Sequence, residues 1–347
     1  MVELETLINV ELNTPLVAGQ GLLVVDENID PKKLTFHEDW LALTNRFDQA
    51  NDLSRAGWAV EFNDFHWPND HDVHRVVIRI PKEKAIVHHL INLAGEHLTP
   101  GDSVVLVGGK SEGIKSIAKH AQAYLYGGRE DQKIGNDLWR IELTRGHSLS
   151  QPLNDHNYTT LVAVTTIGEH SLISKPGVYG WKKIDKGSQL LIERLPEMLG
   201  NPLPLGGIRV LDLGCGSGYL SLASCSASTD IVATDNNCAA LLATQATLNT
   251  AGLRARVVAS NAGDELDSAF DLIVCNPPFH SGFGIDYDLT DRFAKNSAAR
   301  LTDTGCACFV VNQHVPLKRI ASNYFHDVIL DTDTGNFCTY KLQRPKR

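Results

Sequence analysis

The chain has 347 residues, of which 43% are hydrophobic, and a formal net charge of -9. This composition is ordinary for a globular protein with a buried core, and the charge argues against a protein that coats nucleic acid non-specifically. No apolar run approaches the roughly 20 residues of a membrane-spanning helix, and the start "MVELETLINVEL" lacks the basic region of a signal peptide. We therefore expect a cytoplasmic protein that does not bind membranes.

The first half contains a few clear elements. They are three predicted strands and two predicted helices: strands over residues 20–28, 74–81 and 101–109, and helices over residues 82–98 and 113–125. The loop "FNDFHWPNDHDVHR" groups His66, His71 and His74 with several aspartates. Because no pair has the i, i+4 spacing of ligands on a helix and the flanks are turn residues, a polar loop is favoured over a metal site.

From about residue 208 the pattern becomes regular. Predicted strands and helices alternate: strands over 208–213, 230–235, 255–260, 270–275, 306–312, 326–330 and 337–342, and helices over 219–227, 237–252 and 292–305. Such alternation predicts a mostly parallel, doubly wound sheet, in which ligands bind beyond the carboxyl ends of the strands. All seven cysteines lie in this half without a CxxC pair, which favours buried thiols over disulfides or zinc.

The two halves resemble each other. "HRVVIRIPK…GDSVVLVGGKSEGIKSIAKHAQAYL" parallels "FDLIVCNPP…GCACFVVNQHVPLKRIASNYF". We interpret this as a duplicated α/β domain, residues 1–155 and 156–347, and a chance likeness between two unrelated α/β domains is the alternative. The first copy has Ile80 and Pro81 where the second has Asn276 and Pro277, and it has no glycine loop, so we expect it to have lost its site.

A glycine loop follows the first strand of the second copy. "VLDLGCGSGYL" contains Asp212, Gly214, Gly216 and Gly218. Glycines let the backbone approach a ligand closely and turn into a helix whose N-terminus faces that ligand. A dinucleotide fingerprint would need glycine at Tyr219, and the spacing D-x-G-x-G-x-G instead resembles the S-adenosylmethionine loop of Rossmann-like methyltransferases. A tight turn without a ligand is the alternative.

The next two strand ends carry suitable chemistry for the same cofactor. Asp235, followed by Asn236, ends the second strand, where an acidic side chain can hold both ribose hydroxyls. Asn261 and Ala262 follow the third strand and are expected to face the adenine edge. Three successive strand ends with this chemistry favour a cofactor site over a bare turn.

The fourth strand ends on a rigid corner, Asn276-Pro277-Pro278-Phe279, followed by His280. This motif resembles the signature of methyltransferases that act on planar amino or amide nitrogens, which are poor nucleophiles. The Asn276 side-chain oxygen and the Pro277 carbonyl are expected to accept the amine hydrogens, with the prolines preorganising both acceptors. Phe279 offers a flat face for stacking, and Pro278 and His280 are expected to border the substrate.

Longer strings point to one family. "FDLIVCNPPFHSG", "LNTAGLRARVVASNA" and "PGVYGWKKIDKGSQLL" resemble the bacterial ribosomal RNA guanine-N2 methyltransferases of RsmC type, strongly over residues 175–342 and faintly over residues 1–150. The resemblance implies two Rossmann-like methyltransferase domains from a duplication, of which the C-terminal one is active and the N-terminal one degenerate. It also implies S-adenosylmethionine as cofactor, a guanine of small-subunit rRNA as substrate, and a monomer that needs no metal.

The segment before the catalytic domain departs from the family in part. The family usually has Phe-Ser before a Leu-Asp-x-Gly-Ser element, whereas this chain has Val178 to Trp181 and then Ile184 to Ser188. The matching part implies that Asp185 and Gly187 close over the methionine end of the cofactor. Basic residues interleaved with aromatic ones suit an RNA strand, and a solvated loop is the alternative. The candidates for RNA contact are Tyr179, Trp181, Lys182 and Lys183, beside Lys175 and Lys186.

Other readings of the substrate remain open. They are the equivalent guanine-N2 methylation of large-subunit rRNA, methylation of a protein glutamine, and a non-catalytic RNA-binding assembly factor. The α/β first half argues against the glutamine enzymes, whose first domain is usually helical. The intact glycine loop argues against the assembly factor. In the first copy, basic side chains are candidates for phosphate contacts that position RNA: Arg75, Arg79, Lys82 and Lys84.

Overall fold

The computed structural model describes residues 3–135, 137–267, 269–278, 280–281, 284–285 and 287–347. The chain divides into two compact units, Met1–Thr159 (unit 1) and Thr160–Arg347 (unit 2). Tyr158 is fully buried in unit 1 and donates to Asp64 Oδ1 at 2.6 Å, so the break falls a few residues beyond the expected boundary at residue 155. None of the described helices is both long and apolar enough to cross a membrane.

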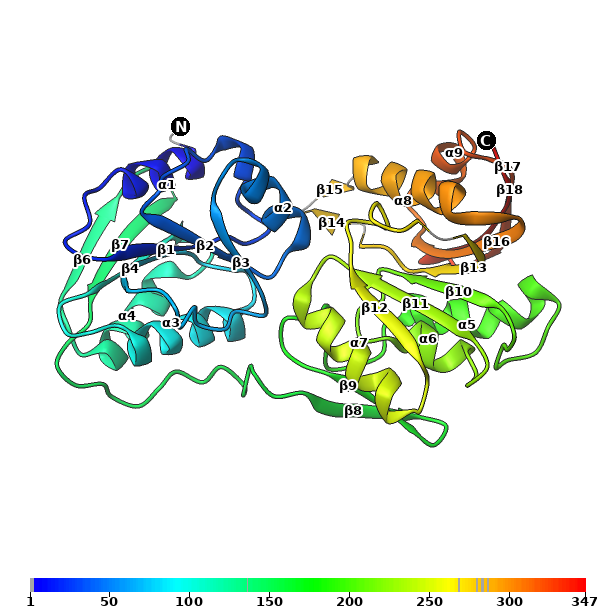
Figure 1. Ribbon diagram of the computed structural model, residues 1–347, viewed down its shortest axis with the longest axis horizontal. Helices are drawn as coiled ribbons and strands as arrows, with labels where there is room; N and C mark the ends of the chain where they lie inside the picture. The colour runs from blue at the N-terminus through cyan, green and yellow to red at the C-terminus, as the bar shows by residue number, and fades with distance from the viewer. Residues whose placement is uncertain (1–2, 136, 268, 279, 282–283, 286) are drawn as a thin grey trace. The chain divides into compact units, whose positions relative to one another are not determined.

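Unit 1 is a seven-stranded sheet with helices on both faces (Figure 1). Its elements are α1 (Leu4–Leu12), β1 (Gln20–Val24), η1 (Pro31–Lys33), β2 (Trp40–Thr44), α2 (Phe47–Arg55), β3 (Ala59–Phe62), β4 (Val73–Arg79), α3 (Lys84–His97), β5 (Ser103–Gly109), α4 (Ile114–Leu125), β6 (Arg129–Lys133) and β7 (Leu138–Thr144). The strand order is β3-β2-β1-β4-β5-β7-β6, with β7 antiparallel to both neighbours. Helices α1 and α2 pack on one face, and α3 and α4 on the other.

Unit 2 repeats this architecture. Its elements are β8 (Val162–Ile167), β9 (His170–Ser174), α5 (Lys186–Leu199), β10 (Arg209–Leu213), α6 (Tyr219–Ser224), β11 (Asp230–Asp235), α7 (Cys238–Thr250), β12 (Ala255–Ala259), β13 (Phe270–Cys275), β14 (His280–Ser281), β15 (Gly284–Ile285), α8 (Tyr287–Arg300), β16 (Leu301–Asn312), α9 (Leu317–Ala321), β17 (Phe325–Asp333) and β18 (Phe337–Pro345). The order β12-β11-β10-β13-β16-β18-β17 matches unit 1 strand for strand. One face carries α5, α6 and α7, and the other α8 and α9.

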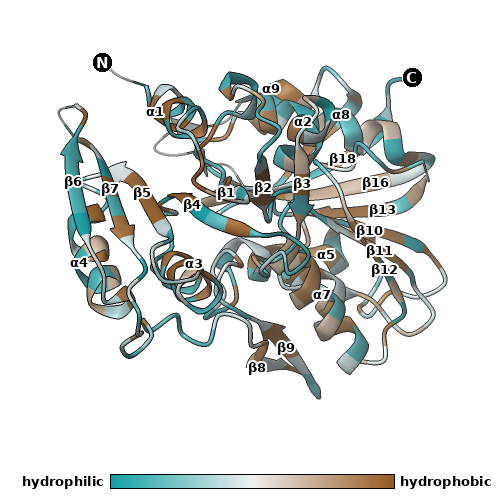
Figure 2. Cartoon of the chain, turned by 60° about the vertical axis from the view of Figure 1, so that its left-hand side comes forward, coloured by the Kyte–Doolittle hydropathy of each residue, from teal (hydrophilic) through white to brown (hydrophobic). Residues whose placement is uncertain are grey.

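The strand register of the two sheets also matches. Leu23 of β1 lies between Ala42 of β2 and Val77 of β4, and Asp212 of β10 holds the corresponding place between Ala233 of β11 and Val274 of β13. The central strands are apolar because helices cover both of their faces, as the brown colour of β13 shows, whereas the edge strand β6 is teal (Figure 2). The shared order and register confirm the predicted pair of Rossmann-like domains.

This register also shows what stands at each strand end of unit 1. Counting two residues on from these paired positions, Arg79 holds the place of Asn276, and Thr44 that of Asp235. The predicted match of Ile80 with Asn276 is therefore wrong by one residue, because Ile80 holds the place of Pro277. Val25 holds the place of Gly214, the first glycine of the loop after β10. The match therefore pairs each candidate site residue of unit 2 with a residue of different chemistry in unit 1.

One predicted helix end is wrong. The helix expected to close on Gly305 ends at Arg300, and residues 301–305 instead begin strand β16. Gly305 lies against the neighbouring strand, since an added Cβ would sit 2.9 Å from the carbonyl oxygens of Phe270 and Asp271. This glycine permits close strand contact and does not cap a helix. Strands β8 and β9 form an antiparallel hairpin that precedes the sheet of unit 2.

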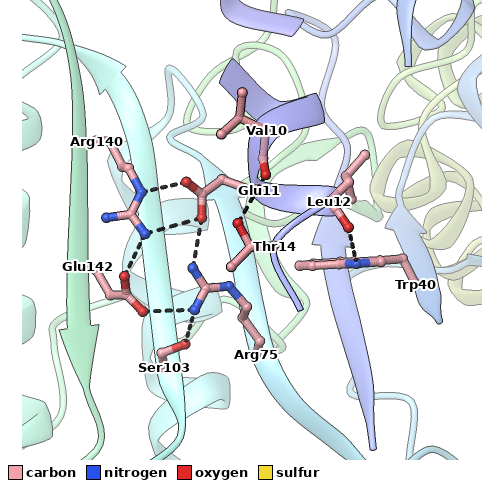
Figure 3. Close-up of polar contacts among 9 residues, drawn as sticks. All are labelled: Val10, Glu11, Leu12, Thr14, Trp40, Arg75, Ser103, Arg140 and Glu142. Atoms are coloured by element: carbon pink, nitrogen blue, oxygen red, sulfur yellow. Dashed lines mark hydrogen bonds and ion pairs between the residues drawn. The ribbon is translucent and has the colours of Figure 1, made fainter. Parts of the chain in front are cut away.

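A buried ion-pair network fixes α1 to the sheet of unit 1 (Figure 3). Glu11 is 2% exposed and accepts from Arg75 Nη2 at 2.7 Å and from Arg140. Both arginines also donate to Glu142. Burial raises the pKa of Glu142, but the hydrogen bonds from Arg140 and Arg75 outweigh it, so the pKa is lowered. The four charges thus compensate one another inside the fold.

This pairing corrects one expectation for unit 1. Arg75 belongs to the internal network, and Arg79 is buried and donates to the next main-chain carbonyl and to Glu112. The proposal that these two arginines contact phosphates is therefore wrong. Lys82 and Lys84 are exposed.

The histidine-rich loop of unit 1 is held by polar side chains. His71 Nδ1 lies 2.9 Å from Gln20 Oε1, and His74 lies 2.8 Å from Asp102 and 3.3 Å from Asp72. The hydrogen bond with Asp102 raises the pKa of His74. Within the described part of the chain, no cluster of three or more histidine, cysteine or acidic side chains is arranged to hold a metal ion.

Candidate active site

The glycine loop turns tightly between β10 and α6. Gly216 and Gly218 have positive φ values of 56° and 80°, which glycine adopts without strain. A Cβ at Gly218 would lie 3.2 Å from the Thr244 side chain, whereas one at Gly216 would meet no atom within 4 Å. The Thr244 hydroxyl donates to the Gly216 carbonyl at 3.0 Å and ties the loop to α7. The open side of Gly216 is where a ligand can approach the backbone.

Asp235 at the end of β11 lies directly against this loop. Its Oδ2 accepts from the Gly216 main-chain N–H at 3.0 Å, and its Oδ1 accepts from Asn237 N at 2.9 Å. A carboxylate has about four lone-pair positions, so it can accept further hydrogen bonds from a ligand. Asn236 follows in the same turn, and Asn237 caps α7. The predicted glycine loop and the predicted ribose carboxylate are thus brought together.

Asp212 is completely buried beneath the loop. Its Oδ2 accepts from the main-chain N–H and the hydroxyl of Ser221, at 3.1 and 2.7 Å, whereas its Oδ1 has no hydrogen-bond partner. Burial raises its pKa to about 6, although the bonds from Ser221 act in the opposite direction. Asp212 thus holds the start of α6 through Ser221, a role that the sequence did not indicate.

Asp212→Asn is expected to remove a pH-dependent loss in the free energy of unfolding of unit 2. The pKa of Asp212 is about 6 in the folded state and 3.8 ordinarily, so between these two pH values the folded state keeps a proton that the unfolded state releases. This loss is absent below about pH 4 and grows to roughly 3 kcal/mol as the pH rises above about 6. Urea unfolding at about pH 4 and about pH 7.5 should show the variant gaining stability relative to wild type only at the higher pH. A stability difference that does not change with pH would contradict this.

The turn after β12 contains Asn261 and Ala262, the predicted adenine contacts. Ala262 has a positive φ of 55° and its methyl group is buried in the core, so only its backbone can face a ligand. Its carbonyl accepts from Asn296 Nδ2 at 2.9 Å. Asn261 N donates to Glu265 Oε2 at 3.1 Å. The turn is therefore fixed by contacts to α8 and within the loop.

The Asn-Pro-Pro corner follows β13 as predicted. Asn276 is half-buried and its Nδ2 donates to Asp185 Oδ2 and Ser188 Oγ, both at 2.8 Å. Pro277 is buried and Pro278 exposed. The residues that follow were also expected to take part: Phe279 lies outside the described residues, and so does the side chain of His280.

The segment before α5 packs against α7. Val178 and Trp181 contact a run of alanines on α7, and Asn237 Nδ2 donates to the Gly177 carbonyl at 2.8 Å. Tyr179 is 90% exposed. Lys182 and Lys183 are exposed, and the Lys182 ammonium lies 5.0 Å from the Trp181 ring centroid. Lys175 is 1% exposed, so its expected place on an RNA-binding surface is wrong.

The fold and the strand-end residues define a Rossmann-like methyltransferase domain preceded by a second domain of the same topology. Residues 169–341 match the family described as methyltransferase small domain, and residues 10–145 match its N-terminal counterpart. The chain belongs to the ribosomal RNA small subunit methyltransferase C family. It is 30% identical to the member from Shewanella loihica over 336 residues, covering 94% of this chain and 95% of the relative.

Two further comparisons agree. The family member from Shewanella piezotolerans is 32% identical over 270 residues, covering 76% of this chain and 75% of the relative. Among solved structures, the Thermus thermophilus 16S rRNA N2 G1207 methyltransferase, in complex with AdoMet and guanosine, matches with a TM-score of 0.79 at 22% identity. That match covers 96% of this chain and 90% of the other, and it shows the same fold for both units.

Proposed function

We propose that this methyltransferase transfers a methyl group from S-adenosylmethionine to the exocyclic N2 amine of a guanine in 16S rRNA. The observation that carries the proposal is that the glycine loop, Asp235 and the Asn276 corner all lie at the carboxyl ends of neighbouring parallel strands, β10, β11 and β13. The name of the solved relative supports guanine N2 as the target. The proposal extends to a cytoplasmic monomer that acts on rRNA of the small ribosomal subunit without a metal ion.

The residues around the glycine loop fit the cofactor. The open side of Gly216 admits a ligand to the backbone, and the buried, unpartnered Oδ1 of Asp212 offers an acceptor to a cationic group. Asp235 is fixed by two main-chain N–H groups and can accept from ribose hydroxyls. When bound, S-adenosylmethionine supplies an electrophilic methyl group. The residues proposed to hold it are Asp212, Gly214, Gly216, Gly218, Asp235, Asn236, Asn261, Ala262, Asp185 and Gly187.

The Asn276 corner is proposed to hold the guanine amine. The Asn276 carbonyl oxygen and the Pro277 main-chain carbonyl accept its two hydrogens, which favours a tetrahedral nitrogen with its lone pair free. Because prolines fix this backbone, the acceptors need no reorganisation during reaction. Phe279 is proposed to stack on the base, and the surrounding RNA to contact Pro278, His280, Tyr179, Trp181, Lys182 and Lys183.

Asp235→Ala is expected to weaken S-adenosylmethionine binding. Hydrogen bonds to a charged group contribute about 1.5–3 kcal/mol, so the loss should be roughly 10-fold to 100-fold in Kd. Isothermal titration calorimetry measures this directly. The control is Asp303→Ala, which removes an exposed carboxylate, 88% accessible, from a surface ion pair with Arg347. Unchanged affinity in Asp235→Ala would mean that the ribose lies elsewhere.

Unit 1 is proposed to bind no cofactor and to support unit 2 and position RNA. Arg79 in place of Asn276 offers no acceptor. Val25 stands in place of the first loop glycine, and the next residue, Asp26, is a buried carboxylate, so side chains occupy the space through which a ligand would approach the backbone. Burial raises the pKa of Asp26 to about 6, with Arg79 nearby lowering it. We therefore expect calorimetry on the full chain to give a stoichiometry of about one. A stoichiometry of two would overturn this role for unit 1.

A substrate panel tests the proposed reaction. The purified chain, with labelled S-adenosylmethionine, is offered small subunits, large subunits and a glutamine-containing protein substrate. Label recovered as N2-methylguanosine from small-subunit rRNA is the expected result. Label in large-subunit rRNA or in glutamine would replace the proposal with one of its alternatives.

A further inference from the structure

Two side chains at the start of α5 hold the amide of Asn276. Its Nδ2 donates to Asp185 Oδ2 and to Ser188 Oγ, each at 2.8 Å. An ionised carboxylate accepts hydrogen bonds and cannot donate them, so the nitrogen of the amide, and not its oxygen, must face Asp185. Both hydrogens of that nitrogen are engaged, and the carbonyl oxygen is therefore turned away from α5.

The two acceptors are themselves fixed by the helix. Asp185 is the N-cap of α5, and the oxygen that accepts from Asn276 also accepts from Ser188 N at 2.9 Å. A Cβ on Gly187 would lie 2.9 Å from this oxygen and 3.2 Å from the Phe337 ring, so glycine allows the carboxylate to lie here. Leu191, one turn further on, is completely buried and anchors the helix to the sheet.

Unit 1 has neither an asparagine in the place of Asn276 nor a side-chain cap at the start of the corresponding helix. Arg79, whose guanidinium can only donate hydrogen bonds, stands in the place of Asn276. Helix α1 precedes the first strand of unit 1 as α5 precedes the parallel strands of unit 2, but its N-cap residue, Glu3, makes no side-chain cap hydrogen bond. The amide and the groups that hold it are thus absent together from the unit that lacks the other site residues.

We propose that Ser188, together with Asp185, is a positioning residue for methyl transfer. The two hold the Asn276 amide in the orientation whose oxygen accepts from the substrate amine. The inference rests on the proposed function, because it takes the substrate nitrogen to be a hydrogen-bond donor. Rotating the amide by half a turn would lose both bonds and set N–H donors against that amine. An acceptor fixed before the reaction needs no reorganisation in the transition state.

Ser188→Ala tests the positioning role with the least disturbance of the helix start. It removes the hydroxyl acceptor but keeps the main-chain N–H that Asp185 caps, so the helix start is retained. We expect kcat to fall on the order of 10-fold to 100-fold while Kd for S-adenosylmethionine stays within about threefold, because only the reacting geometry is disturbed. Ser188→Thr keeps a hydroxyl and is expected to retain most of the activity.

A second readout does not depend on catalysis. Hydrogen exchange of the Asn276 side-chain amide, followed by NMR and assigned by its loss in Asn276→Asp, should be slow in the wild type and faster in Ser188→Ala. Unchanged exchange and kcat in Ser188→Ala would overturn the proposal, as would a rise in cofactor Kd that accounts for the whole loss. If exchange is faster in Ser188→Ala and the wild type does not methylate guanine, the proposed function is wrong. The claim that Asp185 and Ser188 fix the Asn276 amide is then still supported.

Discussion

Asn276→Ala is expected to abolish methyl transfer while affinity for S-adenosylmethionine stays near normal. The substitution removes the carbonyl oxygen that accepts from the substrate amine, and Asn276 bonds to α5 and not to the glycine loop. Loss of one preorganised group that stabilises a transition state costs on the order of 10²-fold to 10³-fold in kcat. Single-turnover methylation and calorimetry with the cofactor separate the two effects.

The matched control for this variant is Asn323→Ala, which removes an exposed asparagine from another part of unit 2. It should leave the rate unchanged. Activity of Asn276→Ala within a few-fold of wild type would remove Asn276 from the mechanism. A large loss of cofactor affinity would instead assign Asn276 to the cofactor.

Glu11→Ala is expected to destabilise unit 1 by about 3–5 kcal/mol, because it leaves two buried guanidinium groups with one shared partner. Arg75 and Arg140 have side chains only 12% exposed, and Glu142 alone would then compensate them. Denaturant unfolding should show an earlier transition for unit 1, while the transition of unit 2 keeps its midpoint. Helix α1 is the element expected to detach first, since Glu11 ties it to β4 and β7.

Glu3→Ala is the control on the same helix. Glu3 pairs with Lys33 at 3.4 Å, with side chains 65% and 51% exposed, and such exposed pairs contribute about 0–1 kcal/mol. A loss in Glu11→Ala no larger than that in Glu3→Ala would show that the network of Figure 3 does not stabilise unit 1.

The elements of unit 2 could be predicted because its parallel strands are covered on both faces and read as short apolar runs. "FDLIVC" and "IRVLDL" are of this kind. Much of unit 1 could not be predicted for the opposite reason. Strand β6 is "REDQK", an edge strand with mostly exposed side chains, and α2 is the polar "FDQANDLSR". Their structure depends on neighbours that the local sequence does not reveal.

The candidate site divides in the same way. The residues at the strand ends follow from the regular pattern, and the predicted Asn276 corner forms after β13. The contact of Asn276 with Asp185 joins residues 91 positions apart, and no local motif indicates it. The motif spacing predicts Asp212 as a cofactor-binding residue, but its hydrogen bond from Ser221 depends on the close turn into α6.

Nucleoside mapping of ribosomal RNA tests the central claim most directly. Both rRNAs are digested and analysed by mass spectrometry from the parent strain, from a deletion strain, and from the deletion strain carrying either the wild-type chain or Asn276→Ala. One N2-methylguanosine should disappear from small-subunit rRNA on deletion and return with the wild-type chain but not with the variant. Unchanged small-subunit rRNA, or a loss confined to large-subunit rRNA, would contradict the assignment of this methyltransferase to 16S guanine N2.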